Sequence, residues 1–101
     1  MSKHLASSWK DHQVIYEDNR MQVISANYTN EDLKNAIGIF WKEIDNVANA
    51  YPVQGNAICP MRLNDELSII LLEGLKVNTK NRLELIEDLI KFYKNKQKEE
   101  E

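Results

Sequence analysis

The chain has 101 residues, of which 43% are hydrophobic and 29% charged, and its formal net charge is −3. This length fits one domain, and this composition is typical of a folded globular chain rather than a disordered one. The negative charge provides no long-range attraction to nucleic acid or anionic lipid, and the longest apolar run, residues 69–72, is too short to span a membrane.

The N-terminal quarter predicts a polar arm followed by a β-hairpin. Apart from Met1, residues 1–12 contain only Leu5 and Trp9 as large apolar side chains, and no hydrophobic stretch of the secretory type. Residues 13–25 place strand-forming residues on either side of Asp18-Asn19, whose side chains tolerate the left-handed backbone of a two-residue turn. Because a lone hairpin is marginal in water, we expect it to pack on other elements.

Residues 29–51 contain the clearest helical pattern. Six large apolar residues recur there at intervals of three or four: Leu33, Ile37, Phe40, Ile44, Val47 and Tyr51. This spacing places them on one side of a helix, which Thr29 and Asp32 would cap and Pro52 would end. Gly38 costs a helix interior about 1 kcal/mol relative to alanine, and it would permit a close approach by another element.

The C-terminal half predicts a connector and two further helices. Residues 51–63 hold both prolines and a Gly-Asn turn signal. Residues 64–77, capped by Asn64, form a helix that is apolar around nearly its whole circumference, so it needs cover from other helices or a second copy. Residues 78–96 form a wide-faced helix, and the short link makes it an antiparallel neighbour.

Together these elements predict an α+β fold that is mostly α, with an N-terminal β-hairpin followed by three helices packed as a small antiparallel bundle. We expect a flexible N-terminal arm over residues 1–12, a single globular domain over 13–96 and a frayed acidic tail over 97–101.

The sequence shows no recognised catalytic or metal-binding pattern. Its three glycines lack the spacing of a phosphate-binding loop, and neither Cys-x-x-Cys nor His-Glu-x-x-His occurs. The single cysteine, Cys59, would need a cationic or basic neighbour to act as a nucleophile, and a small buried hydrophobe is the simpler interpretation. We therefore expect no enzymatic activity, no cofactor and no metal, and, because one cysteine cannot form an internal disulfide, a cytoplasmic location.

The apolar excess and spare aromatic residues favour a protein-binding function. We predict a small non-enzymatic regulator, such as an adaptor, inhibitor or immunity- or antitoxin-like protein, that acts by occupying a partner surface. The candidate partner-binding residues are Trp9, Trp41, Met61 and Arg62. We also expect self-association, most simply as a homodimer through residues 64–77 or the Trp41 side.

Two alternatives stay open. In the first, residues 64–96 form the helix-turn-helix of a small DNA-binding transcriptional regulator. Its base-reading end would contain Thr79, Lys80, Asn81 and Arg82. The acidic residues of the last predicted helix and the negative net charge argue against it. In the second alternative, the chain is a structural subunit of a larger assembly.

Overall fold

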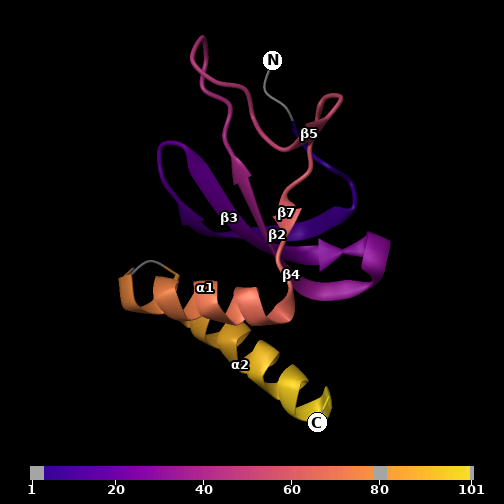
Figure 1. Ribbon diagram of the computed structural model, residues 1–101, viewed down its shortest axis with the longest axis vertical. Helices are drawn as coiled ribbons and strands as arrows, with labels where there is room; N and C mark the ends of the chain where they lie inside the picture. Colours follow the sequence, from indigo (N-terminus) through magenta and orange to yellow (C-terminus); the bar gives the residue numbers. More distant parts are fainter. Residues whose placement is uncertain (1–3, 79–81, 101) are drawn as a thin grey trace. The chain divides into compact units, whose positions relative to one another are not determined.

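The computed structural model describes residues 4–78 and 82–100, with side chains described through Lys96. The fold is α+β with more strand than helix: two sheets form first along the chain, and two helices follow (Figure 1). The chain divides into two compact units, Met1–Arg62 with the strands and Leu63–Glu101 with the helices. Each unit is described by itself.

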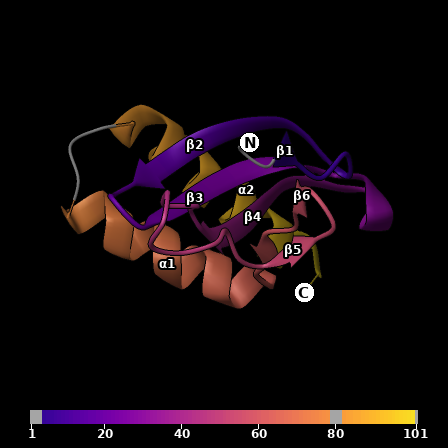
Figure 2. The same ribbon diagram turned by 90° about the horizontal axis from the view of Figure 1, so that it is seen from above.

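The larger sheet has four antiparallel strands. In spatial order they are β2 (Trp9–Glu17), β3 (Met21–Tyr28), β4 (Leu33–Trp41) and β7 (Met61–Arg62). Figure 2 shows β2, β3 and β4 as neighbours. A short 3-10 helix, η1 (Thr29–Glu31), connects β3 to β4. The smaller sheet has the order β1 (His4–Leu5), β6 (Ala57–Ile58) and β5 (Val53–Gln54), with β1 parallel to β6.

The predicted hairpin is present, with longer strands than residues 13–25. Its turn is built differently from the expectation, because no left-handed residue occurs between β2 and β3. Instead, one carboxylate oxygen of Asp18 accepts hydrogen bonds from the backbone N–H groups of Arg20 and Met21, at 2.8 and 2.7 Å. A side chain therefore satisfies the backbone of a turn that contains no glycine.

The prediction of a helix over residues 29–51 is wrong, and so is the prediction of a mostly helical bundle. Its first half forms η1 and β4, and its second half is a loop that returns so that Tyr51 pairs with Trp41. The reason lies in residues 36–41, an almost unbroken apolar run. In a central strand such a run is buried on both faces, and because nearly every position is apolar it also satisfies the helical period.

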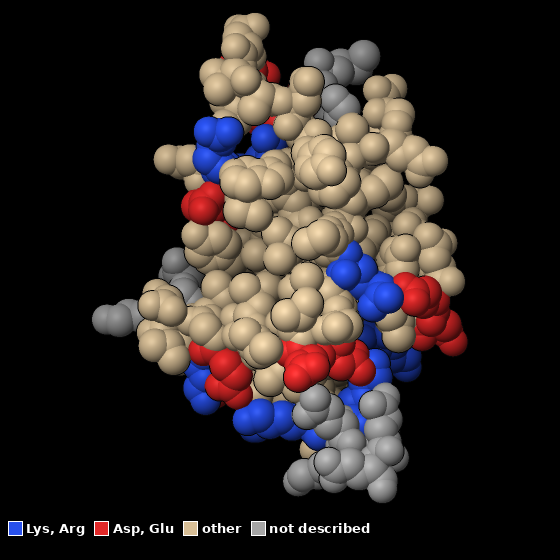
Figure 3. Space-filling view, in the orientation of Figure 1, with Lys and Arg blue, Asp and Glu red and all other residues tan. Residues whose placement is uncertain are grey.

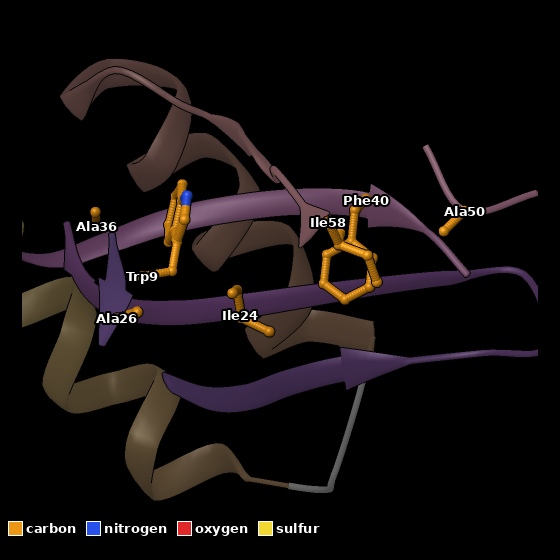
Figure 4. Packing of buried hydrophobic residues seen from close by; sticks show 7 residues of the cluster. All are labelled: Trp9, Ile24, Ala26, Ala36, Phe40, Ala50 and Ile58. Atoms are coloured by element: carbon orange, nitrogen blue, oxygen red, sulfur yellow. The ribbon is translucent and has the colours of Figure 1, made fainter. Parts of the chain in front are cut away.

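The hydrophobic core of the first unit explains Gly38. Seven buried residues form this core (Figure 4): Trp9, Ile24, Ala26, Ala36, Phe40, Ala50 and Ile58. A Cβ atom at Gly38 would lie 2.7 Å from the Trp9 ring and 2.8 Å from Cβ of Pro60. The close approach expected at this glycine is therefore real, but it occurs on a strand and not on a helix.

The second unit is a pair of helices, α1 (Asp65–Asn78) and α2 (Leu83–Glu100). Asn64 caps α1 as predicted, because its side-chain oxygen accepts the N–H of Leu67 at 2.8 Å. An ion pair of 3.2 Å joins Lys96 near the end of α2 to Asp65 at the start of α1. This contact confirms the predicted antiparallel arrangement of the two helices.

Among the described residues, no helix combines the length and apolar character needed to cross a membrane. The expected division into arm, domain and tail stays a prediction. Within the segment expected to form the arm, however, the structure places β1 and the first residues of β2.

Candidate functional site

The strand register separates the four candidate binding residues between the two faces of the larger sheet. Residues that pair across neighbouring strands share a face, and successive residues along a strand alternate. Arg62 pairs with Gly38, on the face that carries the Trp9 core. Met61 pairs with Ile39, two residues before Trp41, so Met61 and Trp41 lie on the opposite face.

Trp9 and Arg62 take part in an internal stack. The Trp9 side chain is only 5% exposed, and its ring lies 4.9 Å from the Tyr28 ring. The Arg62 guanidinium lies 6.0 Å from the same Tyr28 ring and forms two contacts with Glu31, Nε to Oε2 at 2.6 Å and Nη2 to Oε1 at 3.1 Å. Both residues therefore have a structural role, and their part in partner binding stays a prediction.

Trp41 and Met61 lie in an exposed group on the other face. Trp41 is 44% exposed, and Met61 is more than half exposed. Tyr51, also more than half exposed, pairs with Trp41 through two backbone hydrogen bonds of 2.7 and 3.1 Å and thereby shares its face. We call Trp41, Tyr51 and Met61 the exposed aromatic face. Figure 3 shows the molecule in the orientation of Figure 1. In that view, most of the surface over the strands carries no Lys, Arg, Asp or Glu side chain.

A cation borders the exposed aromatic face. The Arg20 guanidinium lies 5.9 Å from the Trp41 ring, within the range of a cation–π interaction. Arg20 belongs to the β2–β3 turn, and its carbonyl accepts the backbone N–H of Lys42 at 2.7 Å, which fixes the turn beside the end of β4. The N–H groups of Arg20 and Met21 hold the pKa of Asp18 below its usual value, so the turn carries a stable negative charge.

The first unit also contains a cavity of about 300 Å³. Its lining is apolar at Leu5, Phe40 and Ile58 and polar at His12, Gln22, Lys42 and Glu43. Glu17 already engages two of these polar groups: it accepts from Gln22 at 2.7 Å and pairs with Lys42 at 3.1 Å. The hydrogen bond from Gln22 lowers the pKa of Glu17 most, and the contact with Lys42 lowers it further. Two of the cavity's polar side chains are thus committed to a partner within the chain.

The remaining chemical candidates are weaker. Cys59 is half-buried, and its thiol points to the Ala57 carbonyl at 3.9 Å. No group of three or more His, Cys, Asp or Glu residues suited to a metal occurs in the part of the chain that the structure describes. Of the DNA-reading candidates, Thr79, Lys80 and Asn81 lie outside the described residues, and Arg82 is exposed just before α2. The DNA-binding alternative stays a prediction.

Nothing in the sequence connects Tyr51 or Arg20 with Trp41. Tyr51 fits the intervals of three or four that predict a helix over residues 29–51. It reaches Trp41 by a loop that returns to the edge of β4, and no local period reveals such a pairing.

No family model, no curated protein and no solved structure matches this chain.

Proposed function

We propose that this protein is a small cytoplasmic, non-enzymatic regulator that acts by occupying the surface of a partner protein. The observation that carries the proposal is the exposed aromatic face, where Trp41, Tyr51 and Met61 lie together on one side of the sheet. Tryptophan, tyrosine and methionine are enriched in protein interfaces, and tryptophan and tyrosine contribute strongly when they fill a partner's pocket.

Ordering of the exposed aromatic face supports this proposal. Trp41 is hydrogen-bonded through its backbone to Tyr51 and lies at the end of a strand that is paired on both sides. The Arg20 contact further restricts its ring. Because these groups are already ordered, binding would cost little additional conformational entropy.

The chemistry of the face indicates the kind of surface that it fits. The partner would present an apolar pocket for the Trp41 ring, with an acidic group at its margin to meet Arg20. A permanent structural subunit would use the same face, and it would differ from a regulator in the lifetime of the complex.

The test combines affinity capture from the native host with quantitative mass spectrometry. Bait proteins would be the wild type, Trp41→Ala, and Leu83→Ala as the control, since Leu83 is a partly exposed apolar residue on α2. We expect one partner to be lost with Trp41→Ala and retained with Leu83→Ala. With that partner purified, calorimetry should show binding weakened by roughly 30-fold, the effect of removing a hot-spot side chain worth about 2 kcal/mol.

The circular dichroism spectrum of Trp41→Ala should match that of the wild type, because Trp41 lies outside the hydrophobic core. The denaturation midpoint should fall only modestly, because the lost ring is 44% exposed and contacts Arg20 at the surface. Recovery of the same proteins with both variants would contradict the proposal. Loss of folding in Trp41→Ala would show that this residue has a structural role instead.

A further inference from the structure

Helix α1 has two apolar sides, and only one of them is covered. The covered side carries the buried residues Ser68, Leu72 and Leu75. On the outward side, Leu67, Ile70 and Val77 are at least half exposed. With Gly74 they are spaced three, four and three residues apart, which keeps them on one side of the helix. We call Leu67, Ile70, Gly74 and Val77 the outward stripe.

We propose that the outward stripe binds the outward stripe of a second copy, with the two α1 helices antiparallel, and that the protein forms a homodimer by this contact. The order of residues in the stripe supports the pairing. Its members are symmetric about position 72: Leu67 and Val77 lie five residues to either side, and Ile70 and Gly74 lie two residues to either side. A two-fold axis at that level therefore places Leu67 opposite Val77 of the second copy and Ile70 opposite Gly74.

Gly74 gives this pairing its shape. Nothing lies within 4 Å of a Cβ atom built at Gly74, so the outward surface of the helix is open at that position. In the antiparallel register this open position faces the Ile70 side chain of the second copy. A large residue opposite a glycine allows two helices to approach closely, and the symmetry repeats this contact on the other side of the axis.

The helix dipoles favour an antiparallel second copy over a parallel one, because antiparallel pairing opposes the two dipoles. The charges at the helix ends add nothing to this preference. Asp65 is already paired with Lys96 at 3.2 Å, and Lys76 lies on the other side of the helix from the outward stripe. Glu73, which lies near the middle of the helix, is already paired with Lys94 at 3.0 Å, so its charge is offset within each copy.

The first test measures mass as a function of concentration by sedimentation equilibrium. A single pair of four-turn helices is a small interface, so we expect a monomer–dimer equilibrium with a Kd on the order of tens of micromolar. Ile70→Glu should weaken dimerisation by at least about tenfold because it places a charge in the apolar contact. Val47→Glu changes an exposed apolar residue of the first unit and should have no effect.

A cysteine experiment tests the register and does not depend on Ile70→Glu being folded. In a Cys59→Ser background, Leu67→Cys and Val77→Cys would be purified separately, mixed and oxidised with oxidised glutathione. The antiparallel register predicts a mixed disulfide between the two variants. Leu67→Cys alone should crosslink poorly, because ten helical residues separate positions 67 and 77 by about 15 Å.

Three results would overturn the proposal: a monomer up to millimolar concentration, rapid crosslinking of Leu67→Cys with itself, or loss of the dimer in Trp41→Ala. The last result would assign self-association to the exposed aromatic face. An unchanged dimer in Trp41→Ala, together with the mixed disulfide, would support the α1 contact whether or not the proposed function holds.

Discussion

β4 and α1 are both apolar segments with a glycine near the middle, and the two glycines have opposite surroundings. At Gly38 the strand is covered so closely that an added Cβ would meet the Trp9 ring at 2.7 Å. At Gly74 the helix is open, and an added Cβ would meet nothing within 4 Å. The same residue type is thus required for packing in the strand, whereas in a single copy of the helix no packing requires it.

The two units differ in how they bury apolar surface. β4 is an inner strand, paired with β3 on one side and β7 on the other, and its residues 36–38 are all buried. α1 buries one side and leaves the outward stripe exposed. The first unit is therefore sensitive to added volume, and the second has apolar surface to spare for a partner.

Gly38→Ala should produce the largest effect. The added methyl group would press on the Trp9 ring and on Pro60, and overpacking of this kind costs about 1–3 kcal/mol. We expect the free energy of unfolding to fall by that amount in urea denaturation. Tryptophan fluorescence is a suitable measurement because Trp9 and Trp41 both belong to the first unit.

A double-mutant cycle identifies the cause of this loss. In a Trp9→Leu background the ring is absent, so Gly38→Ala should cost much less than it does in the wild type. An equal cost in both backgrounds would show that the Trp9 contact is not what requires glycine at this position.

The contrast between β4 and α1 also shows what the sequence could predict. The hairpin, the Asn64 cap and both C-terminal helices were predictable because their signals are local: strand propensity around a turn, a capping residue, and apolar periodicity. The helical prediction fails at β4 because residues 36–41 are apolar at almost every position, and such a run fits the period of a helix as well as that of a strand. Its correct assignment depends on partners distant in the sequence, above all β3 and β7.

The candidate site was also predictable only in part, because some of its residues are placed by contacts that are distant in the sequence. Trp41 and Met61 could be chosen from the sequence as exposed anchor candidates, because large apolar residues with no place in a motif invite that interpretation. Trp9 is equally conspicuous in the sequence, yet it lies in the core. What distinguishes the two tryptophans is the glycine opposite Trp9, and the sequence does not reveal that Gly38 and Trp9 meet.

Gly74→Ala should have a smaller effect of the opposite sign. Alanine is favoured over glycine in a helix interior by about 1 kcal/mol, and the position has room for the methyl group. We expect the free energy of unfolding to rise by that amount, as measured by far-UV circular dichroism at low micromolar concentration, where the proposed dimer is dissociated. A destabilised variant would mean that Gly74 is covered in the isolated chain.

The smallest expected effect concerns two side chains that accept backbone hydrogen bonds, one in the β2–β3 turn and one at the start of α1. Asp18 in the first unit and Asn64 in the second each use a side-chain oxygen to accept backbone N–H groups, but only Asp18 is ionisable. The pKa of Asp18 is lowered from its ordinary value of 3.8 by the N–H groups of Arg20 and then of Met21. The unfolded chain therefore takes up this proton more readily than the folded chain as the solution becomes acidic.

The contribution of Asp18 to stability is consequently full above the unfolded pKa, and it is lost as the pH falls through the lower folded pKa. Asp18→Asn keeps an acceptor oxygen but removes the charge. The stability difference between wild type and Asp18→Asn should thus be largest at neutral pH and shrink below the ordinary pKa of the carboxyl group, as urea denaturation at several pH values would show.

Asn64→Ala should instead lower stability by the same amount across that range, since its cap carries no proton that titrates there. A difference between wild type and Asp18→Asn that did not change with pH would mean that the turn depends on the geometry of Asp18 and not on its charge.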